Sequence, residues 1–112
     1  LYVAQNELQK AIENFSQMPQ KNKVLILGDM FEMGDASEEE HNALLQLCTS
    51  FNFSAILLLG ENFAAVSENS GIKTFRSMEE LGQAVKEPNY QKTAFLIKGS
   101  RGMKMERVLD YL

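Results

Sequence analysis

Residues 23–34 read KVLILGDMFEMG, and this stretch decides the fold class of the chain. Val24–Leu27 is an unbroken apolar run, the pattern of a strand that is buried on both faces of a sheet. Gly28 ends the run, and polar residues follow from Asp29 onward. Ligands of open α/β sheets bind just beyond the carboxyl ends of parallel strands. The segment from Asp29 to Glu32 therefore lies where a ligand is expected.

Two further apolar runs, at 55–59 and 94–97, also end close to a glycine, and residues 72–75 form a weaker strand candidate. Segments with helical periodicity lie before, between and after these runs. The predicted order is one helix followed by four strand–helix units, which is typical of a parallel sheet with right-handed crossovers and helices on both faces. The fold class is α/β. Helices are predicted over about 5–18, from Ser37 to Phe51, around Phe63 and Val66, from Ser77 to Val85, and over a last segment whose inward set is Met105, Val108, Leu109 and Leu112.

Composition limits the function classes. The 112 residues suffice for one domain with a core, and 45% hydrophobic with 23% charged residues is ordinary for a globular protein. The net charge of −4 argues against a dedicated nucleic-acid binder, and the one exception is a local basic cluster of Lys98, Arg101, Lys104 and Arg107. No apolar stretch approaches the roughly 20 residues that span a membrane. The single cysteine, Cys48, is predicted to be a small buried hydrophobe, which suits a reducing compartment. The chain has no initial methionine and reads like a fragment of a longer protein.

The loop after the last apolar run is the strongest candidate for a binding site. Lys98 directly follows the strand, so its ammonium group must reach water or an anion, since burying the charge alone is costly. Ser100, Arg101 and the backbone amides of the next helix would face the same point, and such donors bind carboxylates or phosphates. The competing interpretation is that Lys98 pairs with Asp29 or Glu32 across the strand ends and only holds the loops together.

Other polar residues allow both a structural and a functional interpretation. Glu38–Glu40 follow Ser37 in a capping box and suit the positive end of a helix, so we interpret them as a solvated first turn. His41 lies on the apolar face of that helix, where a lone histidine is usually a boundary residue with satisfied hydrogen bonds. The functional alternative places its ring against a ligand. Met30, in the first loop, is interpreted as one wall of a pocket.

Several known site types are absent from the sequence. It contains no GxxxxGK[ST] phosphate loop, no GxGxxG fingerprint and no GxSxG nucleophile elbow. One histidine excludes a histidine-rich metal site, and no metal ligands are assigned.

Two motifs together resemble a known family. LILGDMFEMG with the downstream SEEEH, and LIKGSRGMKME near the end, look like the C-terminal domain of the bacterial Mur ligases, most closely of the subfamily that adds D-alanyl-D-alanine. That subfamily typically has GDMxELG where this chain has GDMFEMG, so Met33 replaces a leucine. The resemblance covers about 11–112. Before it, this chain has residues 2–8, YVAQNEL, where the family has a segment with Asn-Pro.

The resemblance implies a Rossmann-like, mostly parallel sheet and a place within a larger protein. Residues 1–112 would be the C-terminal domain of a three-domain ligase, with 1–22 as a helix beside the central domain. ATP would phosphorylate the carboxylate of UDP-N-acetylmuramoyl-tripeptide, and the amine of D-Ala-D-Ala would attack the acyl phosphate. ATP and Mg²⁺ would bind mainly to the central domain of this cytoplasmic enzyme. The fragment is expected to hold no cofactor, to contact neither nucleic acid nor membrane, and to be inactive alone.

The resemblance also implies roles for individual residues. The first set meets the incoming dipeptide, whose carboxylate fits the predicted anion site, and consists of Lys98, Gly99, Ser100 and Arg101. The second set faces the nucleotide or the central domain and consists of Asp29, Met30, Glu32, His41 and Glu61.

Two other functions remain open at this point. One is a stand-alone α/β module that binds a small anion and performs no reaction, which the missing ATP machinery would favour. The other is the C-terminal domain of a Mur ligase with a different amino-acid substrate, although KGSRGM favours the D-alanyl-D-alanine-adding type. The sequence assigns no oligomeric state.

Overall fold

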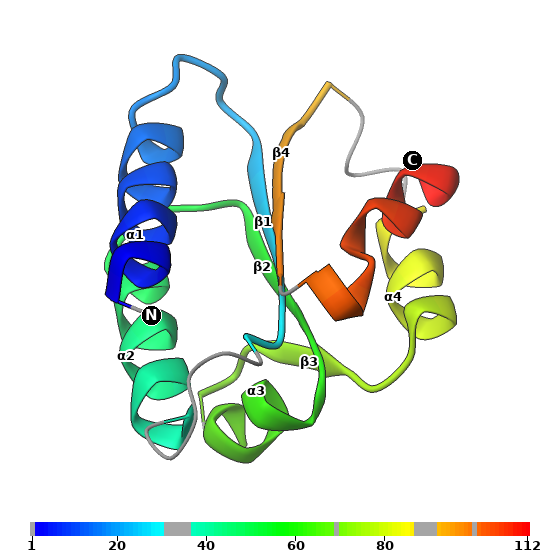
Figure 1. Cartoon of the computed structure of the whole chain (residues 1–112). Helices are drawn as coiled ribbons and strands as arrows, with labels where there is room; N and C mark the ends of the chain where they lie inside the picture. The colour runs from blue at the N-terminus through cyan, green and yellow to red at the C-terminus, as the bar shows by residue number, and fades with distance from the viewer. Residues whose placement is uncertain (1, 31–36, 69, 87–91, 100) are drawn as a thin grey trace.

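The computed structural model describes residues 2–30, 37–68, 70–86, 92–99 and 101–112. Four parallel strands form one sheet in the order β3-β2-β1-β4. The predicted α/β class is confirmed, and helices cover both faces of the sheet (Figure 1). The strands are β1 (Lys23–Gly28), β2 (Ala55–Leu59), β3 (Lys73–Phe75) and β4 (Ala94–Lys98).

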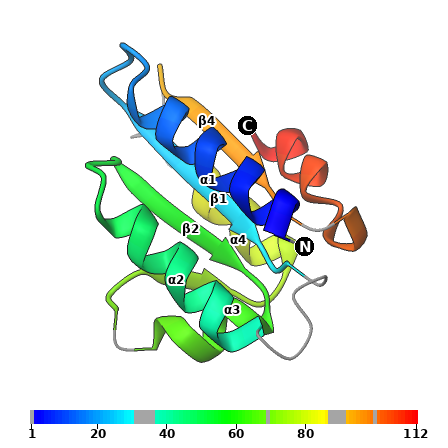
Figure 2. The same cartoon turned by 60° about the vertical axis from the view of Figure 1, so that its left-hand side comes forward.

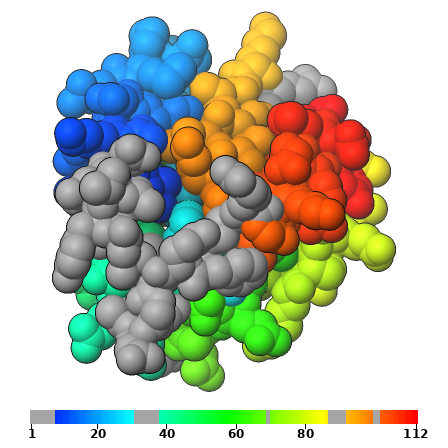
Figure 3. All heavy atoms as spheres, in the orientation of Figure 1, coloured from blue at the N-terminus to red at the C-terminus, as the bar shows by residue number. Residues whose placement is uncertain are grey.

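One face of the sheet is covered by α1 (Tyr2–Ser16), α2 (Ser37–Thr49) and α3 (Glu61–Ser67). The opposite face is covered by α4 (Met78–Val85) and two 3₁₀ helices, η3 (Arg101–Met103) and η4 (Met105–Tyr111). Figure 2 shows α1 and α2 side by side in front of β1 and β2. The space-filling view shows the orange and red C-terminal segment against the yellow α4 (Figure 3).

The central strand β1 explains why its sequence is an unbroken apolar run. Leu25 and Leu27 belong to the core on the α1–α3 side, whereas Val24 and Ile26 belong to the core on the α4 side. All four side chains are 0% exposed. A strand between two helical layers has no wet face, so polar residues cannot alternate along it.

The last helix differs from the prediction. It is a 3₁₀ helix rather than an α-helix, and its backbone bonds join residues three apart, as from Arg107 N to Lys104 O at 3.1 Å. The left-handed conformation of Lys104, with φ +48°, separates η4 from η3 and leaves η4 only seven residues long. Residues three apart share one face of such a helix, which buries Met105 and Val108. The prediction that Leu109 and Leu112 point inward is therefore wrong, and they are 58% and 52% exposed.

The capping box predicted at the start of α4 is confirmed for the hydrogen bond that the serine side chain accepts. Glu80 N donates to Ser77 Oγ at 3.2 Å, and Ser77 Oγ in turn contacts Glu80 Oε1 at 3.3 Å. The side chain of Ser37, in the first predicted box, lies outside the described residues. The interpretation of Glu38–Glu40 as a solvated turn is correct only in part. Glu38 and Glu39 are exposed, but Oε2 of Glu40 is buried and has no hydrogen-bond partner among the described residues.

The prediction for Cys48 is confirmed, since its side chain is 0% exposed within the core of α1–α3. Burial raises the pKa of its thiol to about 12, because the thiolate would lose its hydration. At any pH well below 12 the folded chain therefore holds the neutral, unreactive thiol. We expect iodoacetamide at pH 8 to label the folded chain at least about 100-fold more slowly than the urea-unfolded chain, as followed by mass spectrometry. Equal labelling rates would contradict the burial of Cys48.

Candidate functional site

The carboxyl ends of β1, β2 and β4 lie side by side, as the sequence predicts. In the sheet register, Leu27 of β1 pairs with Leu58 of β2 and with Lys98 of β4. The turns that follow these strands are tightly packed. A Cβ atom on Gly99 would lie 3.2 Å from the Cα atom of Gly28, closer than real side chains normally approach. The three strand ends therefore form one continuous edge.

Asp29, directly after β1, is 3% exposed and caps the helix that follows β2. Its Oδ2 accepts a hydrogen bond from Asn62 N at 2.9 Å, and its Oδ1 accepts one from Phe63 N at 3.0 Å. Its own backbone N–H donates to Leu59 O at 3.0 Å. Because α3 has no capping side chain of its own, the carboxylate of Asp29 satisfies two donors at its positive end. Asp29 thus joins the first two strand-end turns.

Gly60 makes this arrangement sterically possible. Its φ is +127°, and a Cβ atom there would lie 2.2 Å from Cγ of Asp29. Gly60 N also donates to Phe75 O at 3.0 Å, so the turn after β2 is bonded to the end of β3. The absence of a side chain at Gly60 leaves the space that the capping carboxylate occupies.

His41 on α2 holds the start of the loop after β1. Its Nε2 accepts a hydrogen bond from Met30 N at 3.0 Å, which requires that nitrogen to carry no proton. Its ring meets the ring of Phe63 edge-on, with centroids 4.6 Å apart. The interpretation as a satisfied structural histidine agrees with this contact. Its place at a boundary is wrong, since His41 is 0% exposed because α3 packs over it.

The other predicted residues lie in different environments. Met30 is partly buried and packs against the core on the α1–α3 side. Glu61, the first residue of α3, is exposed. Glu32 lies outside the described residues. The nucleotide-facing roles that the resemblance implies for these residues stay predictions.

The predicted anion loop is described in part. Lys98 is exposed at the end of β4, and Gly99 packs against Gly28. Ser100 and the side chain of Arg101 lie outside the described residues. The two oxygens of Asp29 bond to α3 rather than to Lys98, so the structure does not support a Lys98–Asp29 pair holding the loops together.

A groove of about 520 Å³ runs along the strand ends on the side of α4. Its walls are formed by the turns after β2 and β3 and by the helices η3 and η4. The buried Asp29 is among the residues that line it. The other polar or flexible residues that line it are Glu61, Asn62, Arg76, Ser77, Met78, Met103 and Arg107.

The two arginines of this groove, Arg76 and Arg107, belong to no binding motif in the sequence. Arg76 directly follows Phe75, the last residue of β3, so it also stands at a strand end. The apolar pattern of β3 is the weakest of the four strands, and no glycine follows it directly, so the sequence carries little signal for a site at its end. Arg107 lies on η4, beyond the left-handed residue Lys104, and lines the same groove as Arg76.

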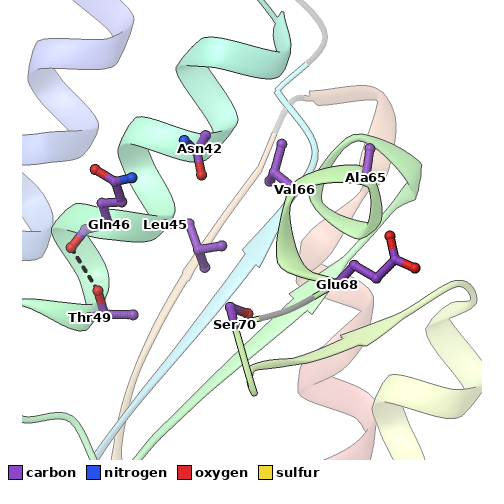
Figure 4. Close-up of a pocket in the computed structure, with 8 residues that line it drawn as sticks. All are labelled: Asn42, Leu45, Gln46, Thr49, Ala65, Val66, Glu68 and Ser70. Carbon is purple, nitrogen blue, oxygen red and sulfur yellow. Dashed lines mark hydrogen bonds between the residues drawn. The ribbon is translucent and has the colours of Figure 1, made fainter.

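A second hollow, of about 340 Å³, lies between α2 and α3, away from the four strand ends. Figure 4 shows Leu45 of α2 and Val66 of α3 facing it, with Thr49 Oγ1 donating to Gln46 O at 2.9 Å. Its side chains are mostly neutral, so it lacks the charged donors of the strand-end groove.

The described ranges contain no group of three or more His, Cys, Asp or Glu side chains placed to hold a metal ion. Within the same ranges, no helix has the length and apolar character needed to cross a membrane.

Comparison with known proteins identifies sequence relatives over almost the whole chain. No protein-family model matches. The UDP-N-acetylmuramoyl-tripeptide–D-alanyl-D-alanine ligase of Rickettsia prowazekii is 29% identical over 108 residues, which are 93% of this chain and 24% of that protein. The chain thus spans about a quarter of the length of this curated relative.

Solved structures share the fold. A crystal structure of MurF from Acinetobacter baumannii superposes with a TM-score of 0.82 and 25% identity, over 95% of this chain and 25% of the other. MurF from Thermotoga maritima, solved in complex with ADP, gives a TM-score of 0.78 at 23% identity, over 96% of this chain and 25% of the other. The Rossmann-like architecture predicted from the sequence is therefore confirmed.

Proposed function

Because this chain is homologous to the MurF ligases and has the fold of a Mur ligase C-terminal domain, we propose that it is the C-terminal domain of an ATP-dependent, D-alanyl-D-alanine-adding ligase. The ligase joins D-Ala-D-Ala to UDP-N-acetylmuramoyl-tripeptide through an acyl phosphate, in the cytoplasm. Residues 1–112 form one of its three domains, and residues 1–22 lie beside the central domain. The observation that carries the proposal is homology over 93% of the chain to a ligase of this name.

The strand-end edge supports a substrate-binding role. Ligands of open α/β sheets bind beyond the carboxyl ends of the strands, where this chain places an exposed Lys98 and the start of the KGSRG loop. We propose that Lys98, Gly99, Ser100 and Arg101 contact the incoming dipeptide. Asp29 and His41 act one step further away, because their side chains fix the neighbouring turns from inside the fold.

The nucleotide and Mg²⁺ are proposed to bind mainly to the part of the ligase outside this chain. The described residues offer no set of metal ligands, so no step of the reaction is assigned to a metal held by this domain. Glu61 is exposed and remains the residue with which this domain would border the nucleotide. The domain contributes by closing over the reactants, which orients them and excludes water.

The test measures the steady-state kinetics of the intact ligase in which Lys98 or Arg101 of the KGSRG loop is replaced by alanine. We expect Lys98→Ala and Arg101→Ala each to raise the KM for D-Ala-D-Ala about tenfold, because each removes a charge-assisted contact to the dipeptide. The KM for ATP should change less than about twofold. Lys73→Ala removes an exposed positive charge at the start of β3, away from the KGSRG loop, and serves as the matched control.

Two results would contradict the proposal in different ways. Unchanged dipeptide kinetics in both loop variants would refute the site assignment. An intact wild-type protein that turns over another amino acid, and not D-Ala-D-Ala, would refute the substrate.

A further inference from the structure

We propose that Arg76 and Arg107 bind the carboxylate of the incoming dipeptide, in the groove on the α4 side of the strand ends. The identity of the dipeptide rests on the proposed function above, whereas the arrangement of charges does not. The inference assigns the carboxylate to two residues that no sequence motif indicated. The KGSRG loop, whose end at Gly102 borders the same groove, then meets the other, reacting end of the dipeptide.

The two arginines come from segments that the fold fixes in place. Arg76 follows Phe75, whose carbonyl oxygen accepts the hydrogen bond from Gly60 N at 3.0 Å. Ser77, the next residue, caps α4. Arg107 lies on η4, which packs on α4 through the Tyr111 ring beneath the Lys86 ammonium, 5.3 Å from the ring centroid. The groove is therefore formed before any ligand arrives, as most small-molecule sites are.

The guanidinium group of Arg107 is oriented by the backbone. Its Nε donates to Lys104 O at 3.1 Å, and one terminal nitrogen donates to Met103 O at 2.9 Å. A guanidinium group carries five N–H donors in a rigid plane, so these two bonds leave others for a ligand. Holding the group in advance lowers the entropy cost of binding an anion.

Arg76 is the complementary donor. Its side chain is exposed, and no hydrogen bond or ion pair to another described residue engages it. Two guanidinium groups on one groove match the planar, two-oxygen geometry of a carboxylate. Arg76 and Arg107 line the same groove, so their like charges oppose each other there, and a bound anion would offset this repulsion.

The remaining lining favours a small zwitterion over a polyanion. Glu61 adds an exposed negative charge, and Asp29 also borders the groove although α3 uses its carboxylate. A dipeptide brings an ammonium group, which the carboxylate of Glu61 would attract, as well as a carboxylate for the two arginines. Leu59 and Met103 contribute apolar surface suited to methyl side chains. The volume of about 520 Å³ lies within the roughly 300–1,000 Å³ of small-molecule sites.

The test compares D-Ala-D-Ala with its C-terminal amide, which keeps the reacting amine and lacks the carboxylate, in the intact ligase. With D-Ala-D-Ala, we expect Arg76→Ala and Arg107→Ala each to raise the KM about tenfold or more, with the KM for ATP unchanged. With the amide, both substitutions should have less than about a twofold effect, since the group they bind is gone. Lys98→Ala and Arg101→Ala should keep their effect with the amide.

Arg76→Ala is the cleaner variant, because Arg76 supports no described contact of the fold, whereas Arg107→Ala also removes two bonds to the backbone. Arg107→Lys keeps the charge and should recover part of the loss. Lys73→Ala, at the start of β3 and away from the groove, controls for the change in net charge.

Several outcomes would overturn the inference while leaving the proposed function intact. The first is wild-type kinetics with D-Ala-D-Ala in the Arg76 and Arg107 variants. In the second, the effects of Arg76→Ala and Arg107→Ala persist with the amide substrate, whereas those of Lys98→Ala and Arg101→Ala disappear with it. That result would assign the carboxylate to the KGSRG loop. A rise confined to the KM for ATP would assign the arginines to the nucleotide.

The affinity of the groove for the dipeptide can also be measured directly, without turnover. Calorimetric titration of the intact protein with D-Ala-D-Ala should show at least about tenfold weaker binding for Arg76→Ala than for wild type. Equal affinity would overturn the inference. If the wild-type protein does not turn over D-Ala-D-Ala, the proposed function is refuted. The titration would still decide the role of the arginines.

Discussion

Replacing Gly60 with alanine is expected to lower the free energy of unfolding by about 3–5 kcal/mol, as measured by urea denaturation. Two costs combine at this residue. Its φ of +127° is a conformation that residues with a side chain rarely adopt. The new Cβ atom would also lie 2.2 Å from Cγ of the buried Asp29, so either the capping carboxylate or the β2–α3 turn must move.

Gly71 provides the matched control for this substitution. It also has a positive φ, +78°, but a Cβ atom there would meet nothing within 4 Å. Gly71→Ala should therefore cost only the backbone strain, about 1–2 kcal/mol. The difference between the two variants isolates the clash with Asp29. Equal losses at both glycines would show that the carboxylate does not occupy this space.

Replacing Asp29 with alanine is expected to cost about 3 kcal/mol, the second-largest effect. The substitution removes the acceptors of two backbone N–H groups at the start of α3, of which Phe63 N is buried. A buried donor without a partner costs more than an exposed cap. Asp29→Asn keeps one carbonyl oxygen and should lose less than Asp29→Ala. Ser77→Ala, which removes the exposed cap of α4, should cost about 1 kcal/mol and serves as the reference.

The two sites should couple, because they compete for the same space. In the Asp29→Ala background, the atoms that a Cβ on Gly60 would strike are gone. Gly60→Ala should then cost about 1–3 kcal/mol less than it does in the wild-type chain. Additive losses in the double variant would argue that Asp29 and Gly60 stabilise the fold independently.

These predictions bear on the proposed function because the same turn forms one wall of the groove. Gly60–Asn62 lies between the capping carboxylate of Asp29 and the end of β3. A substitution that loosens this turn would misplace Arg76, which follows the end of β3. Displacement of a positioning residue by about 1 Å can reduce catalysis substantially. We therefore regard Asp29 as a positioning residue for the proposed substrate groove.

The strands and their order along the chain were predictable from the sequence. Val24–Leu27 had to be buried on both faces, because no polar residue interrupts it, and Ala55–Leu59 and Ala94–Ile97 repeat this pattern. Helical periodicity between the runs then favours parallel pairing. The confirmed alternation of Leu25 with Val24 and Ile26 between two cores follows from the period of a strand. The convergence of the three glycine-ended turns follows from parallel pairing as well.

The last helix shows where local periodicity was insufficient. The positions of Met105, Val108, Leu109 and Leu112 are compatible with an α-helix in the sequence. Only the left-handed turn at Lys104 and the packing on α4 decide for a 3₁₀ helix, which buries the first two and exposes the others. Tertiary contacts outweigh helix propensity in such a short segment, because it forms only a few backbone hydrogen bonds.

What the sequence by itself determined is the layered α/β fold, the burial of Cys48 and the convergence of the glycine-ended turns at one edge of the sheet, since these follow from hydrophobic periodicity along the chain. Only the tertiary structure decided what the polar residues at that edge do. Asp29 caps a helix 33 positions away, His41 bonds to Met30 N, and Arg76 faces the groove that Arg107 also lines. Hydrogen bonds and charge pairs depend on distances of a few ångströms between residues far apart in the chain. Such distances exist only once the strands are paired and the turns are packed.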